Sequence, residues 1–179
     1  DKEYVAQILI GQQRSTGDLE GEVVAEREVL VSVSVEALKN ILQGMVGTLT
    51  LSVSAYSAIK RDGVPMYKRA RAAQKAGTVV ENVPVREMKV DAAELITVNT
   101  IIYDSISNLF TVSPEPQPVE FNEQITPPIS KIFQLVTVRF AVGSGTYIRS
   151  LAEELGARIG YPATLYHLRR TKVGEFDVK

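Results

Sequence analysis

The stretch 136–156, VTVRFAVGSGTYIRSLAEELG, carries the signals of a β-strand, a tight turn and an α-helix in direct succession. Alternating apolar residues over 136–142 predict the strand, and the glycines of 143–145 predict the turn. Thr146 is a candidate N-cap of the helix, and Gly160 stands where a C-cap belongs. Between them, apolar residues recur at helical spacing: Ile148, Leu151, Ala152, Leu155 and Ile159.

Arg149 is the unusual residue of this stretch. A cation in the first helical turn opposes the partial positive charge of the helix N-terminus, at a cost of about 0.3–1 kcal/mol. A negatively charged partner would remove that cost. Glu153, one turn further on, offers a solvated i,i+4 pair, and from this stretch alone that is the favoured interpretation.

The surrounding elements favour an α+β fold. Residues 4–10 alternate as a strand, and residues 23–31 are expected to be extended. Ser34 is a candidate N-cap for a helix whose apolar face consists of Val35, Leu38, Ile41, Leu42 and Met45. The order of elements does not repeat as βαβ units, so we expect a mixed, largely antiparallel sheet with helices packed on it. No repeat or long linker divides the chain, and residues 1–179 are expected to form one domain.

Basic residues are concentrated in two places, although the net charge is only −1. Residues 60–75 contain six Lys or Arg and one acid, with Tyr56 and Tyr67 interleaved, and a short helix is predicted over 67–76. A second cluster consists of Arg169, Arg170 and Lys172. A solvated helix face is the ordinary explanation of such a charge stripe. Two basic clusters that flank a candidate site favour RNA as the partner.

The segment 91–130 has the opposite character. It carries six acidic residues, five prolines and no Lys or Arg, so we expect it to avoid phosphate. We interpret it as an insertion in which residues 98–103 and 109–112 pair as a hairpin, followed by a proline-rich loop.

Composition excludes several kinds of site. The chain has no cysteine, so it has no disulfide or thiolate, and His167 is its single histidine, which argues against a metal centre. No apolar run reaches the ~18–20 residues of a membrane span, and no signal peptide is visible. We therefore expect a cytoplasmic protein without a membrane or metal partner.

Several motifs, in this order, resemble the tRNA pseudouridine synthase B (TruB) family, in particular its bacterial tRNA enzymes. The first is Thr16-Gly17-Asp18-Leu19-Glu20-Gly21, and the second is Tyr56-Ser57-Ala58-Ile59-Lys60 with Tyr67 and Arg71 downstream. The third is the Gly145–Gly156 stretch, and the fourth is Leu168-Arg169-Arg170-Thr171. The segment 91–130 is longer than the family normally has between the second and third motifs.

The resemblance implies a pseudouridine synthase-like fold and the isomerisation of uridine to pseudouridine in tRNA, at uridine 55 of the T arm, without a cofactor. The target base must leave the RNA stack, and Tyr56 matches the aromatic position on which we expect it to stack. Arg149 matches the arginine that holds the nucleophilic Asp, and Tyr147 matches the tyrosine that assists removal of the ring proton. The remaining expected substrate contacts are Lys60, Tyr67, Arg71, Leu168, Arg169 and Arg170.

The family's nucleophilic Asp lies in a Gly-x-Leu-Asp-Pro-x-Ala-x-Gly segment upstream of the position that matches Lys2, and this chain has no such segment. Asp1 lacks that context and Asp18 belongs to a different motif, so neither is expected to take the role. We therefore interpret the chain as a fragment, inactive alone, in which Arg149 would face the missing carboxylate. The alternatives are a noncatalytic tRNA-binding or RNA-folding module and a protein-interaction domain that uses the acidic segment.

Overall fold

The computed structural model describes residues 1–53, 59–78, 80, 83–113, 130–174 and 176–178. Its elements are β1 (Lys2–Ile10), β2 (Gln12–Arg14), β3 (Val23–Glu26), α1 (Val35–Gln43), β4 (Gly47–Ser52), β5 (Lys60–Arg61), β6 (Val64–Pro65), α2 (Met66–Lys75), β7 (Val85–Asp104), β8 (Leu109–Ser113), β9 (Ser130–Val142), α3 (Ile148–Ile159), β10 (Ala163–Val173) and β11 (Phe176–Asp177). The α+β prediction is confirmed.

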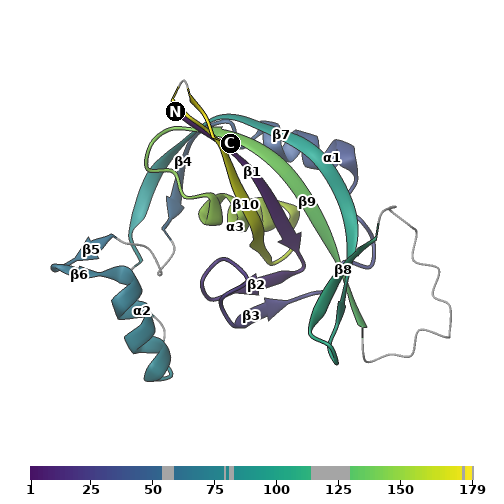
Figure 1. Ribbon diagram of the computed structural model, residues 1–179, viewed down its shortest axis with the longest axis horizontal. Coiled ribbons are helices and arrows are strands. Elements are labelled where there is room, and N and C mark those ends of the chain that lie inside the picture. The colour runs from purple at the N-terminus through teal and green to yellow at the C-terminus, as the bar shows by residue number, and fades with distance from the viewer. Residues whose placement is uncertain (54–58, 79, 81–82, 114–129, 175, 179) are drawn as a thin grey trace.

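The main sheet has the order β11-β10-β1-β9-β7-β4, with β8 paired to β7, and all its pairs in the described part of the chain are antiparallel. Strand β1 lies at its centre, where Tyr4 pairs with Phe140 of β9 on one side and with Arg170 of β10 on the other. These pairings bring the first strand, the strand before α3 and the strand after α3 together (Figure 1).

Helices α1 and α3 pack on one face of the sheet. Along β1, Ala6, Ile8 and Ile10 alternate toward this face, and each has an exposed fraction of 0%. They form the core with the apolar side chains of β9 and with Leu38 and Leu151 of the two helices. A second cluster, Leu9, Ile101, Phe133 and Leu135, lies on the opposite face. Alternation along the strands therefore divides the molecule into two hydrophobic layers.

Three predictions about element ends need correction. Thr146 does not cap α3: Tyr147 is the N-cap, and the Thr146 hydroxyl donates to the Lys89 carbonyl at 3.2 Å. The extended stretch predicted over 23–31 is a strand only over Val23–Glu26, because the chain then leaves β2 and binds the start of β9. Val35, assigned to the apolar face of α1, is 49% exposed.

Two other caps are confirmed. The Ser34 hydroxyl accepts a hydrogen bond from the Ala37 amide at 3.2 Å, as an N-cap should. Gly160 ends α3 with φ +86°, a left-handed conformation that favours glycine. None of the helices in the described ranges has the length and apolarity needed to cross a membrane.

The acidic segment begins inside the main sheet. Residues 91–104 belong to β7 and pair with β9, and β8 pairs with the end of β7 as the predicted hairpin. Residues 114–129, which contain most of the predicted loop, lie outside the described residues. Whether 91–130 is an insertion stays a prediction.

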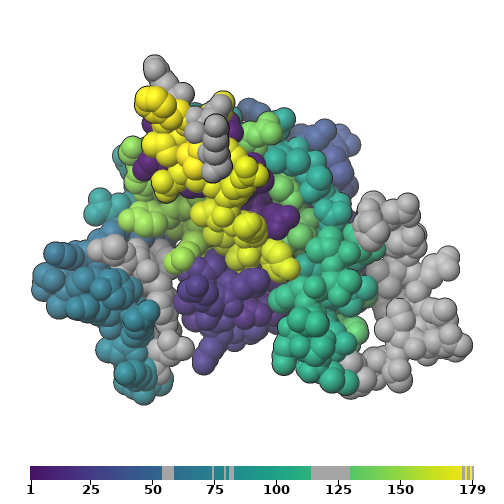
Figure 2. All heavy atoms as spheres, viewed as in Figure 1, coloured from purple at the N-terminus to yellow at the C-terminus, as the bar shows by residue number. Residues whose placement is uncertain are grey.

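The basic segment forms an arm, residues 59–78, made of β5, β6 and α2. Helix α2 runs over Met66–Lys75, within one residue of its predicted bounds, and Lys68, Arg71 and Lys75 are exposed on it. The arm stands away from the sheet, next to β4 (Figure 1), and projects from the surface in the space-filling view (Figure 2). Its shape leaves these cations accessible to a partner.

Candidate active site

Arg149 has a partly buried acidic partner from a distant part of the chain. Its Nη2 lies 2.6 Å from Oδ2 of Asp18, which is on the loop between β2 and β3. The side chain of Asp18 is 16% exposed and that of Arg149 is 38% exposed. The structure therefore gives Arg149 a negative partner within the described residues, as its place in the first turn requires, and that partner is Asp18 rather than Glu153. The i,i+4 interpretation is corrected.

The loop around Asp18 is fixed by several hydrogen bonds. The Thr16 hydroxyl donates to Oδ1 of Asp18 at 2.6 Å, and the Glu20 amide donates to the same oxygen at 3.1 Å. Asp18 also forms an isolated parallel bridge to Leu165 of β10, where the Leu165 amide donates to the Gly17 carbonyl at 2.9 Å. One carboxylate oxygen is thus held by the loop itself while the other faces Arg149.

Gly17 allows the loop to approach α3 closely. Its φ is +78°, and a Cβ built at this position would lie 3.2 Å from the Arg149 Cβ and 3.4 Å from Oε1 of Glu153. A side chain here would strain the backbone and push against the helix. The glycine before Asp18 is therefore part of what places the carboxylate on Arg149.

Two small cavities meet at Arg149 and Leu168. One, of about 210 Å³, is lined by Tyr4, Thr146, Tyr147, Ile148, Arg149, Leu168 and Arg170. The other, of about 310 Å³, is lined by Asp18, Leu19, Glu20, Arg149, Leu165, Tyr166, His167 and Leu168. The structure therefore brings together four of the predicted site residues: Tyr147, Arg149, Leu168 and Arg170.

Tyr4 is a cavity residue that the sequence reasoning missed. It lies on β1 beside Arg170, whose guanidinium carbon is 5.2 Å from the centre of the Tyr4 ring. The ring is 7% exposed and lines the smaller cavity with Tyr147. The available signal was an aromatic residue on the core face of a central strand, but a core tyrosine has the same pattern. Asp18 was considered only as a nucleophile, and its pairing with Arg149 was not foreseen.

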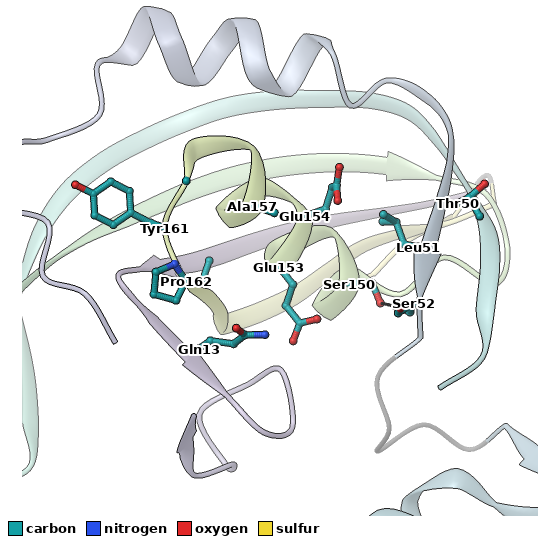
Figure 3. Close-up of a pocket in the computed structure, with 12 residues that line it drawn as sticks. Gln13, Thr50, Leu51, Ser52, Ser150, Glu153, Glu154, Ala157, Tyr161 and Pro162 are labelled. Carbon is teal, nitrogen blue, oxygen red and sulfur yellow. Dashed lines mark hydrogen bonds between the residues drawn. The ribbon is translucent and has the colours of Figure 1, made fainter. Parts of the chain in front are cut away.

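A larger cavity of about 630 Å³ lies on another side of α3 (Figure 3). Ser150, Glu153 and Glu154 line it from the helix, and Ser52 and Gln13 line it from β4 and β2. The Ser150 hydroxyl donates to the Ser52 carbonyl at 2.8 Å. Burial raises the pKa of Glu153, and a hydrogen bond with Gln13 offsets part of that rise. Arg149 and Tyr147 do not line this cavity, so we place the candidate chemistry in the two smaller ones.

The other predicted contacts lie outside these two cavities. Lys60 is exposed on β5, and Tyr67 and Arg71 are on α2, where the Arg71 guanidinium carbon lies 5.8 Å from the Tyr67 ring centre. Arg169 is exposed and pairs with Val5, so it points to the face opposite Leu168 and Arg170. Tyr56 falls outside the described residues.

The described residues contain no group of three or more His, Asp or Glu side chains arranged to hold a metal ion. What the site does offer is a guanidinium that lines both small cavities, a partly buried carboxylate in the larger of them and two tyrosine rings in the smaller. An arginine carries five N–H donors in a fork, and Asp18 occupies Nη2. Such a group can bind a second carboxylate or a phosphate as well as Asp18.

The chain is similar to known proteins over its whole length. Residues 1–113 match the family described as TruB family pseudouridylate synthase (N terminal domain). The tRNA pseudouridine synthase B of Azoarcus sp. (strain BH72) is 34% identical over 177 residues, which cover 99% of this chain and 46% of that protein. The tRNA pseudouridine synthase B of Leifsonia xyli subsp. xyli (strain CTCB07) is 34% identical over 181 residues, covering 100% of this chain and 49% of that protein.

A similarity to solved structures is weaker. It includes the structure of an H/ACA RNP bound to a substrate RNA containing 2′-deoxyuridine, with a TM-score of 0.46 and 17% identity, covering 99% of this chain and 30% of that one. The chain spans about half the length of the curated relatives that it matches. The family match over residues 1–113 shows that the chain belongs to the TruB family of pseudouridylate synthases.

Proposed function

We propose that this chain is the arginine-bearing part of a tRNA pseudouridine synthase that isomerises uridine 55 in the T arm. The observation that carries the proposal is the Asp18–Arg149 pair at the start of α3, next to a cavity lined by Tyr147. The named relatives, which are tRNA pseudouridine synthases, support the substrate class. The nucleophilic Asp is proposed to come from a Gly-x-Leu-Asp-Pro-x-Ala-x-Gly segment joined upstream of Lys2.

The reaction is an isomerisation and needs no oxidant or reductant. The bond between N1 of the uracil and C1′ of the ribose breaks, the base turns, and C5 bonds to C1′. The proton on C5 then leaves and N1 gains one, so atoms and electrons balance. In this proposal Arg149 holds the nucleophilic carboxylate ionised and aligned, with Asp18 keeping the guanidinium in place. Tyr147 lies in the same cavity as Arg149 and takes part in removing the C5 proton.

Base recognition requires the uridine to leave the stack and lie against a ring. Stacking on an aromatic side chain is worth about 1–3 kcal/mol per base. The resemblance assigns that role to Tyr56, and the cavity adds Tyr4 as a second aromatic wall. Leu168 lines both small cavities and is proposed to pack against the flipped base. The cations of α2 bind the phosphate backbone of the tRNA arm.

The test is tritium release from tRNA that carries [5-³H]uridine, using a protein that includes the Gly-x-Leu-Asp-Pro segment. Formation of pseudouridine replaces the C5 hydrogen, so we expect one tritium per tRNA to be released. A tRNA with cytidine at position 55 is the matched control and should release none from that position. If the intact protein binds tRNA but releases no tritium, the proposed function is wrong.

A noncatalytic tRNA-binding module is the second candidate, favoured by one observation. The described part of the basic arm presents Lys68, Arg71 and Lys75 as exposed cations on α2, and binding of tRNA needs such cations but no catalytic carboxylate. The two candidates differ in what Arg149→Lys does: an enzyme loses turnover more than affinity, and a binding module loses at most affinity. A protein-interaction domain would show no tRNA binding that weakens with salt.

A further inference from the structure

A polar chain of contacts leads from the base of the β7–β8 hairpin toward Asp18. Lys131, which pairs with Tyr103 of β7, forms an ion pair with Glu26 of β3. The Gln12 side chain donates to Oε2 of Glu26 at 2.8 Å, and Arg14 Nε donates to Oε1 of Gln12 at 2.9 Å. Gln12, in the middle of this chain of contacts, is 1% exposed, whereas the Glu26 and Lys131 side chains are 23% and 37% exposed.

Arg14 completes the chain at the loop that carries Asp18. Its Nη1 donates to the carbonyl oxygens of Leu19 and Gly21, each at 3.1 Å. These two carbonyls belong to the first and third residues after Asp18, so Arg14 holds the part of the loop that follows the carboxylate. Displacement of Glu26 would therefore reach Asp18 through two intervening side chains.

An apolar chain of contacts runs alongside the polar one. Tyr103 and Phe110 of the hairpin have ring centres 4.9 Å apart, and Phe110 meets Tyr166 of β10 edge to face at 5.7 Å. Tyr166 and Leu19 both pack against the second hydrophobic cluster and both line the cavity that contains Asp18 and Arg149. The hairpin thus supports the wall of the candidate site from the side opposite the helices.

The ionised state of the Glu26 carboxylate fits a structural role, in which it stays bonded to Lys131 and Gln12. Burial acts to raise its pKa, but the hydrogen bonds from Lys131 and Gln12 outweigh burial and hold the pKa below its ordinary value. The hydrogen bond with Glu26 in turn raises the pKa of Lys131, although burial opposes this. Both partners therefore remain charged at neutral pH.

We propose that Glu26 and Phe110 are positioning residues, through which the β7–β8 hairpin holds the Asp18 loop so that its carboxylate stays on the Arg149 guanidinium. The proposal rests on the proposed function for its catalytic consequence. The hairpin is then a structural support of the site rather than a surface for RNA, which agrees with the lack of Lys and Arg in residues 91–130.

The first readout does not depend on catalysis. In the chain itself, the ¹⁵N NMR signal of the Arg149 guanidinium reports its ion pair, and Asp18→Asn defines the signal of the broken state. We expect Glu26→Gln and Phe110→Ala to shift the signal part of the way toward that state. Two variants serve as controls and should leave it unchanged: Glu94→Gln, which breaks an exposed ion pair with Arg139, and Leu109→Ala, whose side chain is 63% exposed on the same hairpin.

The second readout uses the intact protein with saturating tRNA. We expect Glu26→Gln and Phe110→Ala to lower the single-turnover rate roughly 2- to 30-fold, with the tRNA Kd changed by less than about 2-fold. Phe110→Leu, which keeps an apolar side chain, should recover most of the rate. An equal loss for Leu and Ala would contradict a role in packing.

The outcomes distinguish a failure of the proposed function from a failure of the positioning role of Glu26 and Phe110. If the wild-type protein makes no pseudouridine but the Arg149 signal shifts as expected, the proposed function fails and the positioning role stands. If the signal stays unchanged in both variants while the fold is intact by circular dichroism, positioning is wrong. If Phe110→Ala weakens tRNA binding and leaves the rate at saturation unchanged, the hairpin binds RNA and the proposal is overturned.

Discussion

The β2–β3 loop follows the central strand β1 of the main sheet and the basic arm follows the edge strand β4, and the two are fixed to the molecule in different ways. The β2–β3 loop is tied to α3 by the Asp18–Arg149 pair, to β10 by the bridge at Leu165 and to β9 by the Glu26–Lys131 pair. In the described part of the basic arm, the ion pair Arg69–Asp62 joins two residues of the arm itself.

This difference fits the two tasks that the proposed function requires. Chemistry at a flipped base needs groups held to a fraction of an ångström, and packing with hydrogen bonds to several elements supplies that. Capture of a charged RNA backbone needs accessible cations, and exposed side chains on a projecting helix supply those. We therefore expect damage to the β2–β3 loop to change the rate and damage to the basic arm to change affinity.

The largest effect is expected from Asp18→Asn in the intact protein. The substitution removes the carboxylate that keeps the Arg149 guanidinium in place, and we expect the rate at saturating tRNA to fall by roughly 30-fold. This corresponds to about 2 kcal/mol, the lower end for breaking a hydrogen-bonded charge pair, because the pair is partly exposed. Single-turnover tritium release measures the rate.

Asp62→Asn is the matched control for this variant. It also removes an aspartate that pairs with an arginine, at 3.0 Å, but its side chain is 78% exposed and lies in the basic arm. Its effect on the rate should be less than about 2-fold. Equal losses for Asp18→Asn and Asp62→Asn would contradict the distinction between the two regions.

The next effect is expected from replacing Lys68, Arg71 and Lys75 together by Ala. These side chains are exposed on α2, and Ala preserves the helix. Each cation that contacts one phosphate contributes roughly 0.7–0.9 to the slope of log Kd against log salt, so the loss of three should lower the slope by about 2–3. Filter binding from low to moderate salt measures the slope. Lys39→Ala on α1 is the control, and a similar change there would mean that the arm has no special role.

The smallest effect is expected from Glu153→Gln. This variant tests the hydrogen bond between Glu153 of α3 and Gln13 of β2. Because burial raises the pKa of Glu153 in the folded chain, the folded state loses stability as pH rises from the ordinary Glu value of 4.5 through that higher pKa. Glutamine stays neutral and retains a hydrogen-bonding side chain toward Gln13. We therefore expect a higher Tm than wild type at pH 7, with the difference disappearing near pH 4.

Glu154→Gln provides the opposite control. Glu154 accepts from Arg158 Nε at 2.7 Å in a partly exposed i,i+4 pair, so its loss should lower stability by about 0.3–0.5 kcal/mol at pH 7. Thermal melts at both pH values compare the two variants. A lower Tm for Glu153→Gln at pH 7 would show that its charged form is favourable in the folded chain.

Local signals in the sequence predicted the elements, whereas most of the site depends on distant contacts. Alternation found β1, helical spacing found α3, and the Pro and Gly punctuation found α2 within one residue. Thr146 was assigned as a cap because threonine is a common cap residue, but its hydroxyl binds the Lys89 carbonyl of a distant strand. A pattern of neighbouring residues does not show that a distant carbonyl competes with the helix N-terminus for the Thr146 hydroxyl.

The site residues divide in the same way, into those found in contiguous motifs and those that depend on distant contacts. The motif around Tyr147 and Arg149 was recognisable because its residues are contiguous, and Leu168 and Arg170 followed from a second contiguous motif. The pairing of Asp18 with Arg149 required the β2–β3 loop to cross β10, which no periodicity encodes. Tyr4 was missed because its pattern is also that of a core residue.

The most direct test of this account compares Asp18→Asn with the Lys68, Arg71 and Lys75 triple variant in one experiment. Single-turnover pseudouridine formation is followed over a range of tRNA concentrations, which separates the rate at saturation from the half-saturating concentration. We expect Asp18→Asn to lower the rate at saturation with little change in half-saturation, and the triple variant to do the reverse. A triple variant that remains slow at saturating tRNA, or an Asp18→Asn protein that recovers the full rate there, would contradict the account.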